Sequence, residues 1–250
     1  MLDSNTKVKM YDLKLNAMAT EFERQMLDPS CKELSFEERI ALLVDSEWHR
    51  KKDNRIARLL KNAKFNISSA CIEDIEYHPD RKLDKQQFLK FASCNYIAEN
   101  LNIIIMGATG CGKTFLSCAL GNAACRNSYS TMYARLPGLL GELAIARNEG
   151  QFSKVIKQYQ KVKLLILDEW LLHPLKDGEA RDLFEIIEAR VGSGSTIFCS
   201  QFAIDGWHTK IGDSVLADSL LDRIVHSAYK ITVDGKDSMR KRKGIDSAGA

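Results

Sequence analysis

The sequence predicts an α/β fold with a central parallel sheet, preceded by a small all-helical N-terminal domain. From residue 101 onwards, apolar runs of strand length alternate with segments whose apolar residues recur at helical spacing. This alternation is typical of parallel βαβ units. Residues 6–64 keep helical spacing throughout, so we expect helices and no strand in that part of the chain.

A glycine-rich stretch follows the first apolar run and fits G-x-x-x-x-G-K-[ST], the pattern of a phosphate-binding loop. Residues 101–106 before it are expected to form a buried strand, and apolar residues after it recur at helical spacing. In this geometry backbone N–H groups and a helix N-terminus converge on phosphate oxygens. The residues predicted to hold a nucleotide are Gly107, Ala108, Thr109, Gly110, Cys111, Gly112, Lys113, Thr114 and Phe115.

Two residues of this loop have specific expected roles. Lys113 would reach the β- and γ-phosphates, and the Thr114 hydroxyl would hold Mg²⁺. A chance match on a turn is disfavoured by the flanking strand and helix. A dinucleotide-binding loop is excluded by spacing, because the glycines run G-x-x-G-x-G and a Lys-Thr pair follows.

A later apolar run, residues 162–167, is predicted to be a strand that ends in Asp168 and Glu169. We expect Asp168 to bind Mg²⁺ through water or through Thr114, and Glu169 to orient and polarise an attacking water. Strand ends often carry acids before a turn, so this pair alone would be a weak signal. Its position about fifty residues after a phosphate loop makes it a strong one.

Two further positions carry alternative interpretations. A strand over residues 195–201 would end in a polar side chain, Ser200 or Gln201, that touches the attacking water or the γ-phosphate; it would otherwise be an ordinary strand end. Arg223 lies in a predicted helix, residues 216–228. It is either a surface residue paired with Asp222 or an arginine that reaches the γ-phosphate of a neighbouring subunit.

Charge is concentrated in one predicted helical segment. Residues 50–64 hold seven basic residues and one acid, a net charge of +6, whereas the other 235 residues sum to −3. A basic amphipathic helix is most often only a solvated face, but this concentration favours contact with nucleic-acid phosphates. The residues predicted to contact DNA are Arg50, Lys51, Lys52, Arg55, Arg58 and Lys61.

Several local signals predict the remaining elements. Asp28-Pro29 breaks the first helical segment, and Ser35 with Glu38 forms a capping box that starts the next one. Strands are also expected at 131–135 and 229–233, and Trp207-His208 in a loop. Further helices are expected at residues 83–92, 136–147, 152–159 and 180–191.

The seven cysteines form no C-x-x-C pair, so we expect reduced thiols, with Cys118 and Cys125 on the buried face of one helix. No apolar run has the length of a signal-peptide core or a membrane span. We therefore expect a cytoplasmic protein with no membrane partner.

Together these motifs resemble the AAA+ ATPases and, more narrowly, the IstB helper ATPases of insertion-sequence transposition, which are similar to the DnaC helicase loaders. The resemblance covers nearly the whole chain. It is carried by the phosphate loop, the Asp-Glu strand end, and residues 34–39, 45–48, 58–61, 77–85, 200–201, 207–208, 211–213, 221–223 and 238–241.

The resemblance implies an N-terminal helical DNA-binding domain and a C-terminal three-layer αβα ATPase domain. From the residues themselves we place the helical domain at 1–66, a linker at 67–82, the ATPase domain at 83–243 and a disordered tail at 244–250. The resemblance also implies ATP and Mg²⁺ as ligands, duplex DNA and a transposase as partners, and a homo-oligomer that assembles with ATP. Ser200 would be the sensor-1 residue, Arg223 an arginine finger acting in trans, and Arg240 the sensor-2 arginine. Cys199 stands where the family pattern has Thr, which leaves sensor 1 between Ser200 and Gln201.

Our functional hypothesis from the sequence is an ATPase that assembles on duplex DNA and stimulates a transposase, with hydrolysis remodelling or dismantling the assembly. A replicative helicase loader would use the same chemistry with another partner. A small-molecule kinase would use the same loop without DNA, and a clamp would bind ATP without useful turnover.

Overall fold

The computed structural model describes residues 2–176, 178–235 and 238–242. The chain divides into two compact units, Met1–Arg58 and Leu59–Ala250. The division falls inside one long helix, α3 (Phe36–Ala63). We describe each unit by itself.

The first unit contains α1 (Leu2–Asp12), α2 (Asn16–Leu27), the short 3₁₀ helix η1 (Pro29–Lys32) and most of α3. The predicted break at Asp28-Pro29 is confirmed. The predicted capping box is also confirmed: the Ser35 hydroxyl accepts from the Glu38 backbone N–H (3.2 Å), and the Glu38 carboxylate accepts from the Ser35 N–H (2.7 Å). These bonds satisfy N–H groups that the first turn of a helix leaves unpaired.

A buried carboxylate joins α2 to α3. Glu47 of α3 is 4% exposed, and it accepts from the backbone N–H groups of Ala17 (2.9 Å) and Met18 (3.3 Å) in the first turn of α2. Arg50 donates to the same carboxylate (2.5 Å) and lowers the pKa of Glu47. Glu47 thus caps α2 from a neighbouring helix, a role that sequence spacing does not reveal.

The second unit is built on a five-stranded sheet with strand order β2-β3-β4-β1-β5, in which every neighbouring pair is parallel. The strands are β1 (Asn102–Gly107), β2 (Thr131–Arg135), β3 (Leu164–Asp168), β4 (Ser195–Ser200) and β5 (Ala228–Val233). The other elements are η2 (Pro79–Arg81), α4 (Lys85–Ala92), α5 (Asn95–Ala98), α6 (Lys113–Arg126), α7 (Leu136–Asn148), α8 (Phe152–Lys161), α9 (Glu179–Arg190), η3 (Ile204–Gly206), α10 (Trp207–Ile211), α11 (Ser214–Val225) and α12 (Met239–Arg242).

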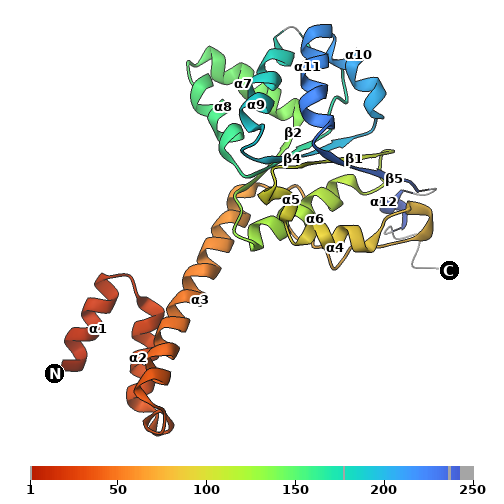
Figure 1. Ribbon diagram of the computed structural model, residues 1–250. Coiled ribbons are helices and arrows are strands. Elements are labelled where there is room, and N and C mark those ends of the chain that lie inside the picture. Colours follow the sequence, from red (N-terminus) through yellow and green to blue (C-terminus); the bar gives the residue numbers. More distant parts are fainter. Residues whose placement is uncertain (1, 177, 236–237, 243–250) are drawn as a thin grey trace. The chain divides into compact units, whose positions relative to one another are not determined.

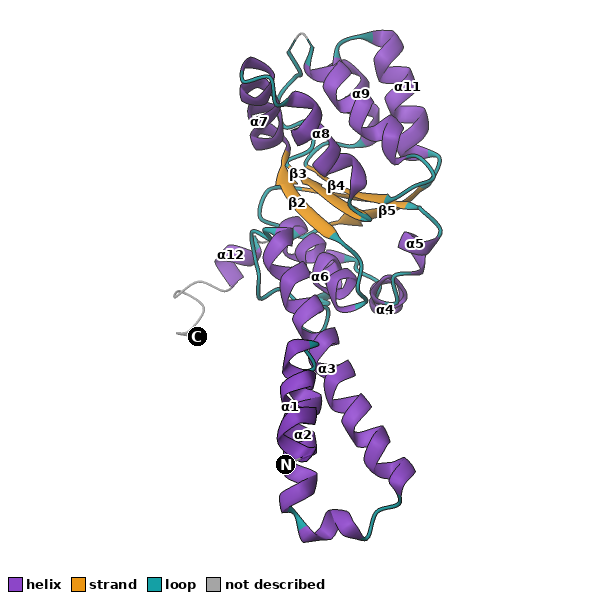
Figure 2. Cartoon of the chain, turned by 90° about the vertical axis from the view of Figure 1, so that its left-hand side faces the viewer, coloured by secondary structure: helices purple, strands orange, loops and turns teal. Residues whose placement is uncertain are grey.

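Helices cover both faces of this sheet (Figure 1). Ile103 and Ile105 of β1 pack in a core with α4 and α6, whereas Ile104 packs in a second core with α7, α8, α9 and α11. Successive side chains of a strand point to opposite faces, so each strand contributes to both cores. The predicted three-layer α/β architecture with a parallel sheet is confirmed (Figure 2).

The structure corrects one predicted loop and one helix end. Trp207 lies in helix α10, and its ring is fully buried between Trp170 and Phe198, with ring centroids 5.7 and 6.3 Å away. Trp207 and Ile211, about one helical turn apart, are both buried, so packing against the core fixes this short helix. Helix α11 ends at Val225, before residue 228, because β5 begins at Ala228 in register with Asn102.

The cysteines occur as free thiols, and Cys118 and Cys125 are both fully buried on α6, as predicted. Burial raises the pKa of the Cys118 thiol to about 11, which makes it unreactive. Among the residues that the structure describes, no helix is both long and apolar enough to cross a bilayer.

Candidate functional site

The parallel register brings the predicted site residues to one edge of the sheet. Gly107, Asp168 and Ser200 each stand at the carboxyl end of a strand, and β1, β4 and β3 are neighbours. In open parallel sheets this edge is where ligands bind. The phosphate loop and the acid pair, separated by about fifty residues in the chain, therefore lie side by side.

The phosphate loop leads directly into α6, which begins at Lys113. Gly110 (φ 81°) and Gly112 (φ 97°) adopt left-handed backbone conformations that favour glycine. A Cβ atom would also lie 2.3 Å from Ser238 Oγ at Gly110 and 2.9 Å from Arg81 at Gly112. The glycines are thus required both by backbone conformation and by close neighbours.

Lys113 is 8% exposed, and its ammonium lies across the loop, where it donates to the carbonyls of Gly107 (2.7 Å) and Ala108 (2.9 Å). This placement concentrates a positive charge where the N-terminus of α6 already favours anions. The loop can therefore hold phosphate groups, and Phe115 lines the same pocket.

Thr114 and Asp168 meet directly. The Thr114 hydroxyl donates to Asp168 Oδ2 (2.7 Å), and the hydroxyl of Tyr133 donates to the same oxygen (2.8 Å). Mg²⁺ prefers oxygen ligands and keeps several waters and phosphate oxygens, so one or two protein groups suffice. Among the described residues no cluster of three or more His, Cys, Asp or Glu could hold a metal by itself. The Thr114–Asp168 pair fits a nucleotide-bound Mg²⁺.

Glu169 follows at the strand end with a left-handed backbone (φ 56°), which is uncommon for a residue other than glycine and occurs often at functional sites. Its carboxylate forms an ion pair with Arg135 at the end of β2 (2.8 Å). This pairing raises the pKa of Arg135. Glu169 therefore lies beside the loop but is held by a partner from the neighbouring strand.

The structure distinguishes the two candidates at the tip of β4. The Ser200 hydroxyl is fully buried, donates to the Trp170 carbonyl (3.2 Å) and accepts from the Phe202 N–H (3.1 Å). Gln201 is exposed, and its side-chain oxygen accepts from the Thr109 hydroxyl in the phosphate loop (2.9 Å). Of the two side chains, Gln201 contacts the loop.

Arg223 lies at the other end of the sheet. It stands in the last turn of α11, shortly before β5 begins, and it lines a small cavity with Asn102 and Thr196 at the amino ends of β1 and β4. Six-residue strands separate it from the loop by about 20 Å. The arginine pairs with Glu188 of α9, and it also donates to Ser219 and stacks on Phe184. It does not reach the phosphate loop of its own subunit.

The remaining predicted ATPase residue, Arg240, lies in α12, but its side chain is outside the described residues. The same helix begins on the phosphate loop, since the Met239 N–H donates to the Gly110 carbonyl (2.9 Å). Met239 also lines a cavity of about 330 Å³ that opens beside Gly110, Lys113 and Thr114. This cavity adjoins the phosphate loop and has room for further groups of a bound ligand.

Sequence reasoning missed four residues that touch this site: Arg81, Tyr133, Arg135 and Met239. Arg81 is buried, and it donates to the carbonyls of Glu76 (2.5 Å) and of Cys111 in the loop (2.9 Å). Burial lowers the pKa of Arg81. Arg81 and Met239 lie in stretches that carry the family resemblance, but no local pattern assigns any of the four to the site, because each reaches the loop or the acids through tertiary contacts.

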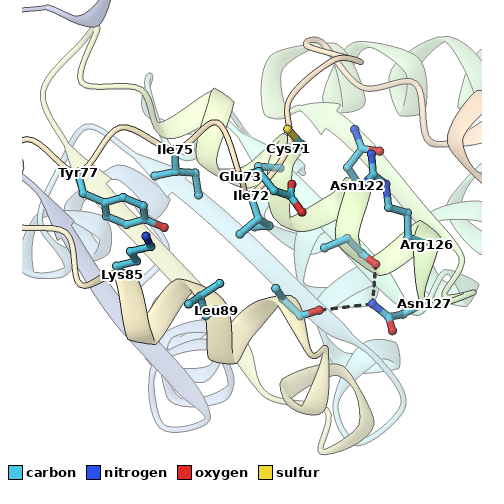
Figure 3. A pocket seen from close by; sticks show the side chains of 13 residues that line it. Cys71, Ile72, Glu73, Ile75, Tyr77, Lys85, Leu89, Asn122, Arg126 and Asn127 are labelled. Carbon is cyan, nitrogen blue, oxygen red and sulfur yellow. Dashed lines mark hydrogen bonds between the residues drawn. The ribbon is translucent and has the colours of Figure 1, made fainter.

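A second cavity, of about 510 Å³, lies between α4, α6 and residues 71–77 (Figure 3). Its lining is mixed, with the apolar residues Ile72, Ile75 and Leu89 beside Lys85 and Arg126. No residue of the phosphate loop and neither acid lines it. The phosphate loop instead lines the smaller cavity, which neither acid lines.

The predicted DNA-contacting residues all lie on α3, but they differ in their partners. Arg50 is bound to Glu47 and to the Lys14 carbonyl (2.9 Å), and the ammonium of Lys51 lies 3.8 Å from Glu47. Lys52 lies over the Trp48 ring (4.8 Å). Arg55, Arg58 and Lys61 lie farther along the helix and, like Lys51 and Lys52, are exposed.

Comparison with known proteins agrees with this site. Residues 8–247 match the family model described as IstB-like ATP binding protein. A putative insertion sequence ATP-binding protein, y4pL of Sinorhizobium fredii, is 37% identical over 97% of this chain and 99% of its own length. The IS1162 putative ATP-binding protein of Pseudomonas fluorescens is 42% identical over 80% of this chain and 87% of its own length.

The fold is also that of a solved helicase loader. The crystal structure of DnaC matches with a TM-score of 0.54 at 19% identity, over 66% of this chain and 97% of that chain. At this identity the match concerns the fold alone. With the phosphate loop, the acid pair and the match over nearly the whole length, the chain belongs to the family of IstB-like ATP-binding proteins.

Proposed function

We propose that this protein is an ATP-hydrolysing transposition helper. It binds duplex DNA through α3, assembles into a homo-oligomer with ATP and Mg²⁺, and recruits and stimulates a transposase. The observation that carries the proposal is the site at the carboxyl edge of the sheet, where Lys113, Thr114, Asp168 and Glu169 come together. The insertion-sequence names of the relatives support the transposase as partner.

Hydrolysis is supported by the division of labour between the acids. Asp168 and Thr114 would hold Mg²⁺, which neutralises charge on the β- and γ-phosphates when bound. Glu169, as a free carboxylate, would orient the attacking water. Positioning and charge stabilisation account for most catalysis in phosphoryl transfer, so little else is required of the chain. The ion pair with Arg135 engages Oε1 of Glu169 and leaves Oε2 for contact with a water.

Assembly is supported by the position of Arg223. Because it lies about 20 Å from its own phosphate loop, it can complete a site only in a neighbouring subunit. An arginine supplied in trans stabilises the transferred phosphoryl group and can raise turnover by about 10³–10⁵-fold. The pairing with Glu188 keeps the arginine at the surface of α11 and α9.

The variant Glu169→Gln tests the hydrolysis. It should keep ATP affinity and ATP-dependent assembly, while phosphate release falls by about 10²–10³-fold, as for loss of one key catalytic group. Steady-state phosphate release measures turnover. Size analysis with ATP, with ADP, and with ATP plus duplex DNA measures assembly. Full turnover in Glu169→Gln would remove this residue from the role and favour another base.

Mixed oligomers test the action of Arg223 in trans. Arg223→Ala and Lys113→Ala should each be inactive alone, but a mixture should recover part of the turnover, because one variant supplies an intact loop and the other an intact arginine. Glu188→Ala is the matched control, since it removes the partner of Arg223 and keeps the arginine. A mixture without any recovery would argue against shared sites.

A replicative helicase loader is the second candidate, and the fold shared with DnaC favours it. The ATPase site would be the same and only the partner would differ. Co-purification from the native host separates the two: recovery of a transposase supports the transposition helper, and recovery of the replicative helicase supports the loader.

A further inference from the structure

The Asp168 carboxylate is buried, and its hydrogen-bond donors are two hydroxyl groups and one backbone amide. It is 5% exposed. Oδ1 accepts from the Glu169 N–H (2.8 Å), and Oδ2 accepts from Thr114 (2.7 Å) and from Tyr133 (2.8 Å). A buried carboxylate needs such donors, because removal from water is costly unless its oxygens are hydrogen-bonded.

Tyr133 reaches this carboxylate from the neighbouring strand. In the β2–β3 register it lies opposite Ile166, two residues before Asp168, and its ring packs in the core beside α6. The hydroxyl therefore reaches Asp168, at the carboxyl end of β3, from the face of the sheet that α6 covers. A phenol is protonated at neutral pH, so the Tyr133 hydroxyl is a donor to the carboxylate.

The two side-chain donors, Thr114 and Tyr133, differ in whether a bound nucleotide would change their contacts. Thr114 is expected to offer its oxygen to Mg²⁺, so its geometry depends on the ligand. The Tyr133 hydroxyl donates to Asp168, and its ring is packed in the core, so the geometry of Tyr133 does not depend on the ligand. Two donors from different elements, α6 and β2, meet at Oδ2 and so favour one orientation of the carboxylate.

We propose that Tyr133 is a positioning residue for the magnesium site: its hydroxyl holds Asp168 in the orientation that serves the metal of the bound nucleotide. The proposal rests on the assignment of Thr114 and Asp168 to Mg²⁺ in the proposed function, and it concerns neither DNA nor assembly. Tyr133 itself is neither a ligand nor a base. Groups that orient metal-binding residues in this way are worth about 10–100-fold in metal affinity.

The test is Tyr133→Phe in the full chain, with a fluorescent ATP analogue as the probe. Nucleotide affinity in EDTA should equal that of the unaltered protein, while the Mg²⁺ concentration at half-maximal enhancement of binding rises by about 10-fold. In an Asp168→Asn background the same change should have no effect on the Mg²⁺ midpoint, because the oriented carboxylate is already gone. Thermal unfolding verifies that each variant is folded.

Two tyrosines of the same unit provide matched controls. Tyr96 is buried and its hydroxyl has no hydrogen-bond partner among the described residues, and the Tyr159 hydroxyl donates to Glu142. Tyr96→Phe and Tyr159→Phe should leave the Mg²⁺ midpoint unchanged. If Tyr133→Phe does not fold, Tyr133→Met, which keeps a bulky apolar side chain without the donor, takes its place.

Three outcomes would overturn the inference. An unchanged Mg²⁺ midpoint shows that Asp168 needs no help from Tyr133. An equal loss of affinity with and without Mg²⁺ shows that Tyr133 is only structural. If the unaltered protein binds the analogue with the same affinity in EDTA and in Mg²⁺, the metal assignment of the proposed function fails, and this inference fails with it.

Discussion

Residues 1–58 and residues 59–250 differ in how many side chains they bury and in the kind of side chain that is buried. The second unit places large aromatic and aliphatic residues in two cores on either side of its sheet. The first unit buries few residues, among them the polar Gln25 and Glu47, and leaves Phe36, Val44 and Trp48 exposed. A packed unit can hold catalytic groups in fixed geometry, whereas a sparsely packed helical unit presents its side chains to other molecules.

The largest expected effect is on stability, and it distinguishes a tryptophan of the second unit, Trp207, from one of the first, Trp48. Trp207→Ala should lower the free energy of unfolding by about 3–5 kcal/mol, because its fully buried ring fills the core beside β4. Trp48→Ala should change it by less than about 1 kcal/mol, because that ring is 54% exposed and contacts mainly His49 and Lys52. Chemical denaturation of both variants measures the difference, and equal losses would contradict the contrast.

A smaller effect is expected from the buried acid of the first unit. Glu47→Gln should destabilise residues 1–58 by about 1–2 kcal/mol, because the cap of α2 and the pair with Arg50 both weaken. Nucleotide affinity in the second unit should not change. Hydrogen exchange of the α2 amides detects the loss, and Glu37→Gln, an exposed acid of the same helix, is the control.

The same carboxylate predicts a pH dependence. Because the pKa of Glu47 is lowered in the folded chain, its contribution is fully present above its ordinary pKa of about 4.5 and is lost as the pH falls below that value. Acid titration followed by helix content should therefore show α2 loosening in unaltered protein and no such step in Glu47→Gln.

The smallest expected effect concerns DNA. Each phosphate contact contributes about −0.9 to the slope of log K against log[salt], so about four contacts per subunit would give a slope near −3.6. Arg58→Ala with Lys61→Ala should reduce the magnitude of the slope by about 1.8 and leave ATP binding intact. Arg126→Ala, which removes a basic residue that lines the second cavity, is the control. An affinity independent of salt would refute the role of α3.

Much of the site was readable before the structure because its signals are local. The glycine loop depends on backbone conformations that neighbouring residues specify, and Gly110 and Gly112 have them. The capping box at Ser35 and Glu38 is likewise local. Asp168 and Glu169 were predictable because an apolar strand ending in two acids follows the phosphate loop by about fifty residues.

Other features depended on which strands and helices become neighbours. Tyr133 and Arg135 reach the two acids only because β2 pairs with β3, and no spacing in the sequence encodes that pairing. Trp207 is helical because of the core it enters. Gln201, not Ser200, contacts the loop because the Ser200 side chain is turned into the protein by its bonds to Trp170 and Phe202.

By itself, the sequence determined the α/β class, the phosphate loop with its acids and the basic segment of α3, because periodicity, backbone preference and charge act over a few neighbouring residues. Only the tertiary structure decided that Asp168 has a second hydroxyl donor, that Glu169 is held by Arg135, and that Arg223 lies at the far edge of the sheet. These contacts join residues about 30 or more apart in the chain, and strand order alone brings them together.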